Sequence, residues 1–110
     1  MKLITKEIRT KLEANAWKTE IKGKDDHRPV VKLFNPAGAA TWLLTEIEGD
    51  IAFGLCDLGM GSPELGSVSI TELESYKSLG IGIERDIYFE ADKTISQYAE
   101  AARASGSIVA

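Results

Sequence analysis

The stretch VVKLFNPAGAATWLLTEIEGDIAFGLCDL, residues 30–58, decides the fold. It contains three apolar runs, VVKLF (30–34), ATWLLTEI (40–47) and IAFGLCDL (51–58), which the short segments NPAG and EGD separate. Asn, Pro and Gly supply the backbone angles that tight turns need. Parallel neighbours need a crossover of about a dozen residues or more, so strands joined by such short connections are antiparallel. The stretch therefore predicts a three-stranded antiparallel meander.

Further elements are expected on both sides of the meander. Before it, residues 5–16 predict a helix with Thr5 as its N-cap. After it come a fourth strand (GSVSI, 66–70), one or two helical turns (TELESYKSL, 71–79), a further strand (GIGIERDIYFE, 80–90) and a final helix (DKTISQYAEAARAS, 92–105). This order predicts one α+β domain over residues 1–110, an antiparallel β-sheet meander with two to three helices packed on one side. The expected ordered core spans residues 3–104, and residues 105–110 are expected to form a flexible tail.

Cap residues mark the ends of the later helices. Thr71 and Glu74 in TELE match a capping box, in which each side chain binds the backbone N–H of the other residue. Asp92 is the expected N-cap of the final helix, and Gly106 is its expected end. The predicted buried face of that helix consists of Ile95, Tyr98, Ala99 and Ala102.

The glycine-rich stretch GLCDLGMGSPELGSVSITELESY, residues 54–76, is the segment that most suggests a ligand-binding loop. A phosphate-binding P-loop needs GxxxxGK[ST], and the stretch contains no lysine. The dinucleotide fingerprint needs GxGxxG before a helix, whereas Gly59, Gly61 and Gly66 are spaced as GxGxxxxG before a strand. We therefore expect a turn between strands and no cofactor.

Catalytic and metal-binding patterns are equally weak. Cys56 is the single cysteine, which excludes an internal disulfide and a cysteine-cluster zinc site. Ser62, Ser67 or Cys56 would need an adjacent base to act as a nucleophile, and His27, the single histidine, lies in a distant polar loop. The acidic residues show no ligand spacing such as DxDxDG. We expect no catalytic residue, no metal site and no enzymatic activity.

Charge is distributed unevenly along the chain, whose net charge is −4. Residues 1–40 carry nine basic and five acidic side chains, whereas residues 41–110 carry four basic and twelve acidic ones. An acidic surface repels nucleic acid and suits a basic protein partner, although such charge also simply keeps a protein soluble.

Arg85 and the acidic residues around it are the first candidates for such a surface. In a regular strand, Glu84, Asp86 and Glu90 would share one face, and Arg85 would lie among isoleucines on the other. A buried arginine needs a carboxylate or several carbonyl groups as partners, so Arg85 is either structural or a contact for an anion or a partner. The further acidic candidates are Glu46, Glu48, Asp50 and Asp57.

Four blocks of the sequence are similar to those of a known family. LITKEIRTKL, VKLFNPAGAATWLLTE, FGLCDLGMGSPELGSVSITELES and GIGIERDIYFE resemble, in the same order, the signature blocks of the domain-of-unknown-function 2958 family. The resemblance covers residues 2 to about 90. It implies a small bacterial protein of plasmids and integrative elements, and it implies no activity that could be assigned to particular residues.

These observations lead to three functional hypotheses. The first is a non-enzymatic accessory protein of mobile DNA that binds a protein partner through an acidic surface, as an inhibitor of a host defence or DNA-processing system would. The second is a nucleic-acid-associated module or small enzyme that uses Arg85 and the basic N-terminal half. The third is a homodimeric scaffold joined at exposed sheet edges. No stretch is apolar enough to span a bilayer and the first residues are charged throughout, so we expect a cytoplasmic protein without membrane contact.

Overall fold

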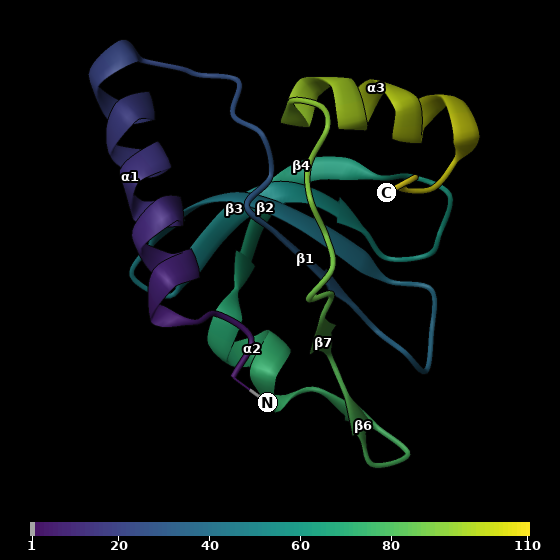
Figure 1. Ribbon diagram of the computed structural model, residues 1–110. Coiled ribbons are helices and arrows are strands. Elements are labelled where there is room, and N and C mark those ends of the chain that lie inside the picture. The colour runs from purple at the N-terminus through teal and green to yellow at the C-terminus, as the bar shows by residue number, and fades with distance from the viewer. Residues whose placement is uncertain (1) are drawn as a thin grey trace.

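A five-stranded antiparallel sheet forms the centre of the molecule (Figure 1). The computed structural model describes residues 2–110. The strand order is β4-β3-β2-β1-β7, and the strands are β1 (Val31–Phe34), β2 (Thr41–Glu48), β3 (Ile51–Asp57), β4 (Glu64–Ser69) and β7 (Glu84–Arg85). A separate hairpin consists of β5 (Lys77–Ser78) and β6 (Ile81–Gly82). The helices are α1 (Lys6–Lys22), α2 (Ile70–Ser75) and α3 (Ile95–Ser105). The predicted antiparallel meander and the α+β fold class are confirmed.

Helices cover both faces of the sheet, which differs from the one-sided arrangement that we expected. Leu43 packs in one apolar cluster with Leu55 and α3, whereas Leu44 packs in another with Leu12 of α1 and with α2. Adjacent residues of a strand point to opposite faces, so these two clusters lie on opposite sides of the sheet. The physical reason is visible in β2, where the run from Trp42 to Thr45 is buried without interruption. A strand of this kind needs cover on both faces.

A β-bulge at Thr45 reverses the alternation within β2. Leu44 pairs with Gly54 and Glu46 pairs with the next residue of β3, so Thr45 is an extra residue on its strand. Beyond the bulge, Ile47 faces the same cluster as Leu44, three positions away, and Glu46 takes the opposite face. Without the bulge, Glu46 would point into this core in place of Ile47.

The bulge also fastens α1 to the sheet. An extra residue leaves a backbone group without its ladder partner. Asn15 of α1 supplies one, because its Nδ2 donates to the carbonyl oxygen of Thr45 at 2.9 Å. The Thr45 hydroxyl, which is fully buried, donates to the carbonyl oxygen of Phe53. The position of α1 over the sheet therefore depends on this irregularity in β2.

The helix α1 continues to Lys22 rather than ending at residue 16. Thr5 is its N-cap as predicted, since its Oγ1 accepts the N–H of Ile8 at 3.2 Å. The last turns carry Trp17 and Ile21, both mostly exposed, so they lack the core-facing pattern by which a helix is recognised in a sequence. The helix ends at Gly23, whose φ of 83° is the left-handed conformation of a helix stop.

The other predicted caps are partly wrong. The N-cap of α2 is Ser69, not Thr71, and Glu74 accepts the N–H of Leu3 at 3.1 Å instead of closing a capping box. The N-cap of α3 is Thr94, while Asp92 accepts the hydroxyl of the Tyr98 side chain. The end at Gly106 and the buried face of α3 are as predicted: Ile95, Tyr98, Ala99 and Ala102.

The segment after α3 lies against the sheet, although we expected it to be a flexible tail. The N–H of Ile108 donates to Asp57 Oδ2 at 3.0 Å, and Ile108 packs beside the cluster under α3. Lys32 Nζ donates to the carbonyl oxygen of Ala110 at 2.8 Å. Residues on β1 and β3 thus hold this segment in place.

Gly54 is required where β2 passes closest to β3. A Cβ atom at Gly54 would lie 1.9 Å from the carbonyl oxygen of Leu43 and 2.8 Å from the Cα of Leu44, and a backbone cannot yield as a flexible side chain does. Gly66 is paired with Gly54 on β4, yet a Cβ atom there meets nothing within 4 Å.

We expect Gly54→Ala to lower the free energy of unfolding by about 2–4 kcal/mol, because β2 and β3 must separate locally to admit the methyl group. Gly66→Ala is the matched control and should change stability by less than about 1 kcal/mol. Urea unfolding followed by circular dichroism measures both. Equal effects of the two substitutions would show that the close approach at the bulge does not constrain the fold.

Candidate functional site

The acidic side chains of residues 84–90 do not continue as a regular strand. The strand β7 contains Glu84 and Arg85 alone, and the chain turns after it. Asp86 accepts the N–H of Tyr88 at 2.9 Å within this turn and lies 3.6 Å from Lys32 Nζ. Glu84 and Glu90 are exposed. These acidic residues therefore do not share one strand face.

Arg85 holds the N-terminal segment to the sheet. Its Nη1 donates to the carbonyl oxygens of Lys2 and Leu3, both at 2.8 Å. Leu3 is fully buried in the core under α1. Carbonyl groups rather than a carboxylate thus accept from this guanidinium, which is one of the structural arrangements that the sequence allowed.

Asp57 and Asp50 both have partners within the chain. Asp57 is 2% exposed, and its two oxygens accept the N–H groups of Gly59 and Ile108. Asp50, in the turn between β2 and β3, accepts from the hydroxyl groups of Ser69 and Thr71 and from the Thr71 N–H. Asp57 is therefore out of reach of a partner, and Asp50 fastens the β2–β3 turn to the start of α2.

Residues 46–49, at the end of β2 and in the turn after it, line a groove beside α1. Glu46 and Glu48 are among them, although the alternation beyond the bulge turns their side chains toward the face of the sheet away from Ile47. Two further glutamates from α1, Glu13 and Glu20, line the same groove, and its volume is about 610 Å³. Trp17 lies between them on α1 and is 64% exposed. We call this feature the acidic groove, lined by Glu13, Trp17, Glu20, Glu46 and Glu48. It brings together two of the predicted acidic candidates and none of the others.

The sequence pattern of α1 explains how the acidic groove arises. Glu13 and Glu20 are seven residues apart, so they lie on one side of the helix, and Trp17 lies between them toward solvent. Lys11, Lys18 and Lys22 repeat on the opposite flank. We did not single out Glu13, Trp17 or Glu20 from the sequence, because we ended the helix at residue 16, before Trp17 and Glu20, and Glu13 alone shows no spacing. The seven-residue spacing would have revealed them in a longer helix.

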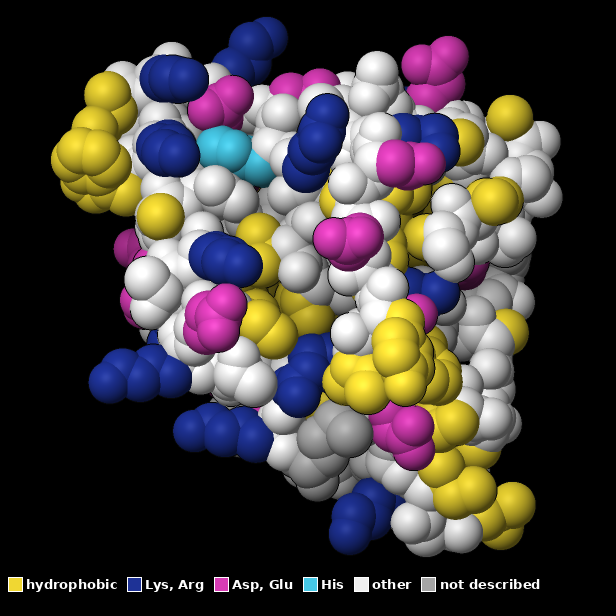
Figure 2. All heavy atoms as spheres, viewed as in Figure 1, with side chains coloured by type: hydrophobic (Ala, Val, Ile, Leu, Met, Phe, Trp, Pro, Cys, Tyr) yellow, Lys and Arg dark blue, Asp and Glu magenta, His cyan; other side chains and the backbone are white. Residues whose placement is uncertain are grey.

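The other flank of α1 is basic. Figure 2 shows Lys and Arg side chains projecting along this helix, with apolar side chains gathered near its upper end. In the described part of the chain, the ion pairs of α1 residues are Arg9 with Glu13 at 3.8 Å, Lys11 with Glu7 at 3.6 Å and Lys22 with Asp25 at 3.2 Å. Exposed pairs of this kind contribute little to stability. The charges on α1 therefore remain available for contacts with other molecules.

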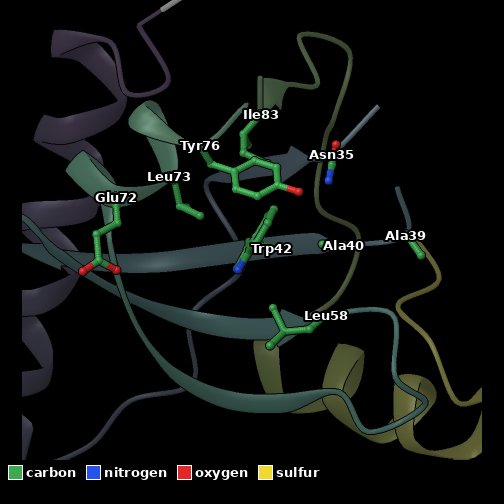
Figure 3. Close-up of a pocket in the computed structure, with 9 residues that line it drawn as sticks. All are labelled: Asn35, Ala39, Ala40, Trp42, Leu58, Glu72, Leu73, Tyr76 and Ile83. Carbon is green, nitrogen blue, oxygen red and sulfur yellow. The ribbon is translucent and has the colours of Figure 1, made fainter. Parts of the chain in front are cut away.

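A second concave feature surrounds Trp42 at the opposite end of β2 (Figure 3). Its volume is about 420 Å³, and we call it the Trp42 pocket. The apolar wall comes from four separate segments, as Trp42, Leu58, Leu73 and Ile83. The polar rim comes from Asn35, Glu72 and Tyr76. Trp42 itself is 6% exposed, because it is also part of the core.

Reactive groups are not gathered in either feature. Burial raises the pKa of the Cys56 thiol, which disfavours the nucleophilic thiolate. The His27 ring is hydrogen-bonded to the Thr19 hydroxyl at 2.9 Å, beside the last turns of α1. Within residues 2–110, no three His, Cys, Asp or Glu side chains are placed as a metal site needs. No helix in that range is long and apolar enough to cross a membrane. The two features differ in their lining: that of the groove is charged, and that of the pocket is largely apolar.

The Asp50 contacts make a prediction for the pH dependence of stability. Hydrogen bonds from the Ser69 hydroxyl and then from Thr71 hold the pKa of Asp50 below its ordinary value of 3.8. A lowered folded-state pKa contributes stability that is present above the ordinary pKa and is lost as the pH falls through the folded-state pKa. We expect Asp50→Asn to be less stable than the parent at about pH 7, and this difference to shrink as the pH falls to about 2.

Urea unfolding at a series of pH values measures that difference. Glu100→Gln, an exposed change on α3, is the control and should give no such trend. An Asp50→Asn deficit that stays constant down to the lowest pH would contradict the role of the ionised carboxylate.

Comparison with known proteins places the chain in a family. No match was found among curated proteins or among solved structures. A family model described as "Protein of unknown function (DUF2958)" matches residues 3–109. The match includes every helix and strand described above, as well as both concave features. The chain therefore belongs to the domain-of-unknown-function 2958 family.

Proposed function

We propose that this chain is a non-enzymatic binding protein that captures a basic protein partner in the acidic groove. The observation that carries the proposal is one groove whose lining includes four glutamates from two elements, Glu13, Glu20, Glu46 and Glu48, together with one exposed tryptophan. Charged groups of one sign in a concave surface attract a partner of opposite charge and set its orientation. The bound segment of the partner would be rich in Lys or Arg.

Trp17 gives the acidic groove an anchor for such a partner. Trp17 and Ile21 are 64% and 63% exposed, and they are four residues apart on α1, so their side chains are neighbours. Neither side chain belongs to the core, so exposing them lowers solubility and does not stabilise the fold. Tryptophan is among the residues that most often dominate binding energy when an interface covers it. An arginine of the partner can also stack on the indole ring.

The family resemblance suggests the setting in which this binding operates. A protein of plasmids and integrative elements would meet host enzymes that process or destroy incoming DNA. Such enzymes carry basic grooves for DNA, and an acidic protein can occupy a groove of this kind in place of DNA. An inhibitor of a host defence or DNA-processing system, of the anti-restriction or anti-CRISPR type, is therefore the form of the proposal that the charge pattern favours. The cytoplasm, where those enzymes work, is the expected location.

One observation favours a second function. The basic flank of α1, formed by Lys11, Lys18 and Lys22, could contact phosphate groups, as a nucleic-acid-associated module would require. An electrophoretic shift assay at low salt tests this function, because phosphate contacts are strongest there. A shift with DNA or RNA that Lys11→Gln/Lys18→Gln/Lys22→Gln abolishes would favour it over protein capture.

Two variants with the same change in charge test the acidic groove. Glu13→Gln/Glu20→Gln/Glu46→Gln/Glu48→Gln removes four negative charges from the groove. Glu64→Gln/Glu84→Gln/Glu90→Gln/Glu100→Gln removes four exposed ones elsewhere and includes two of the candidates named from the sequence. Wild-type bait captures partners from a bacterial extract, and binding of the purified partner is then measured with each variant.

We expect the groove variant to bind the partner at least about tenfold more weakly and the control variant to bind it nearly as wild type. Trp17→Ala should weaken binding by about tenfold or more without lowering the thermal stability, because the side chain is outside the core. The proposal would be overturned if the control variant lost as much affinity as the groove variant, or if Trp17→Ala bound as wild type. Size-exclusion chromatography of the bait alone tests the homodimer alternative, for which the edge strand β4 offers free ladder groups.

A further inference from the structure

The Trp42 pocket contains a hydrogen-bond donor that the protein leaves unused. Within residues 2–110, no side-chain N or O atom that is sealed from solvent lacks a hydrogen-bond partner. No hydrogen bond within residues 2–110 uses the indole N–H of Trp42 as its donor, so this N–H is in contact with solvent. Trp42 is also one of the residues that line the pocket. Trp42 is only 6% exposed, and the indole N–H of a tryptophan buried to this extent normally has a hydrogen-bond acceptor.

The rim of the pocket determines what kind of molecule could supply that acceptor. Glu72 is the one charged residue that lines the pocket, its side chain is exposed, and the hydrogen bonds with Ser69 and Ser75 involve only its backbone. Asn35 Oδ1 accepts the N–H of Ala37 at 3.0 Å, which leaves its Nδ2 as a donor. No Lys or Arg lines the pocket, so nothing there would compensate a phosphate or carboxylate. A ligand must therefore be neutral or cationic.

The wall of the pocket adds a requirement of shape. The indole of Trp42 and the ring of Tyr76 both line the pocket, with Leu73 and Leu58 on either side of Trp42 in Figure 3. The same view shows the indole nitrogen at the end of Trp42 that is farther from Tyr76, on the side of the view on which Glu72 also lies. Flat aromatic rings stack on aromatic side chains, and a volume of about 420 Å³ is enough for a molecule of one or two rings.

We infer that the Trp42 pocket binds a planar heteroaromatic ring that carries an amino group and no phosphate, the class to which aminopurines and aminopyrimidines belong. A ring nitrogen accepts from the Trp42 N–H, the amino group donates to Glu72, and the apolar side chains cover the ring faces. The pocket lies at the other end of β2 from the acidic groove, so this inference does not depend on the proposed function.

The indole N–H signals of the intact chain in a nitrogen–proton correlation spectrum test the inference directly. The chain has two tryptophans, and Trp17→Phe assigns the two signals. We expect adenine at millimolar concentration to shift the Trp42 signal and leave the Trp17 signal in place. Purine, which lacks the amino group, and adenosine monophosphate, which adds a phosphate, should each bind about tenfold more weakly than adenine.

Glu72→Gln supplies the matched variant, since its side chain is exposed and the fold does not depend on it. It should weaken adenine binding by about tenfold, whereas Glu64→Gln, an exposed change on β4, should leave it unchanged. The inference is wrong if millimolar adenine leaves the Trp42 signal in place. It is also wrong if purine binds as tightly as adenine, if both tryptophan signals shift alike, or if Glu64→Gln weakens binding as much as Glu72→Gln.

Discussion

The bulge at Thr45 is the constraint on which the rest of this fold depends. It changes which face of the sheet each later residue of β2 occupies, so that Ile47 reaches the core and Glu46 leaves it. It leaves the carbonyl oxygen of Thr45 free to accept a hydrogen bond from Asn15 of α1. Just before it, the β2 backbone at Leu43 and Leu44 lies so close to β3 that only glycine fits at residue 54. A single extra residue thus decides which side chains of β2 are buried and provides the backbone carbonyl that α1 binds.

The two concave features follow from the same arrangement. Because β2 is buried on both faces, α1 and α3 occupy opposite sides of the sheet. The end of β2 beyond the bulge lies beside the middle and the last turns of α1, and this pair of segments forms the acidic groove. The other end lies beside the short helix α2 and forms the Trp42 pocket. The central strand is thus the rigid element between two surfaces that differ in chemistry, one charged and one largely apolar.

Much of this fold could be predicted from the sequence, because its signals are local. The turn residues of NPAG and EGD determine the meander, and Thr5 and Gly106 mark helix ends by their own conformational preferences. The choice of Ser69 over Thr71 as a cap could not be predicted, since it depends on Asp50, which approaches from another turn. Two-sided cover was recognisable in principle from the unbroken apolar run in β2. Our error was to treat that run as an ordinary meander strand.

The candidate site was harder to predict, because its residues come from elements far apart in the sequence. Charge counts indicated an acidic half of the chain, yet the acidic groove draws two glutamates from the half that is basic overall. Asp57 looks exposed in the sequence and is buried, since the segment after α3 folds back and donates to it. The sequence alone does not show whether a carboxylate accepts hydrogen bonds from backbone N–H groups of its own chain, as Asp57 does, or is free to bind another molecule.

The opposite charges on the two flanks of α1 have an effect that reaches beyond any contact. Lysines along one side of a helix and glutamates along the other produce an electric dipole across the helix axis, in addition to the dipole along it. The field of such an arrangement extends for about 10 Å at an ionic strength of 0.1 M. A charged molecule within that range experiences a torque before the surfaces touch, so that encounters begin in a favoured orientation. Ionic strength would then govern how often a collision is productive, whereas apolar contacts such as those of Trp17 would govern how long the complex lasts.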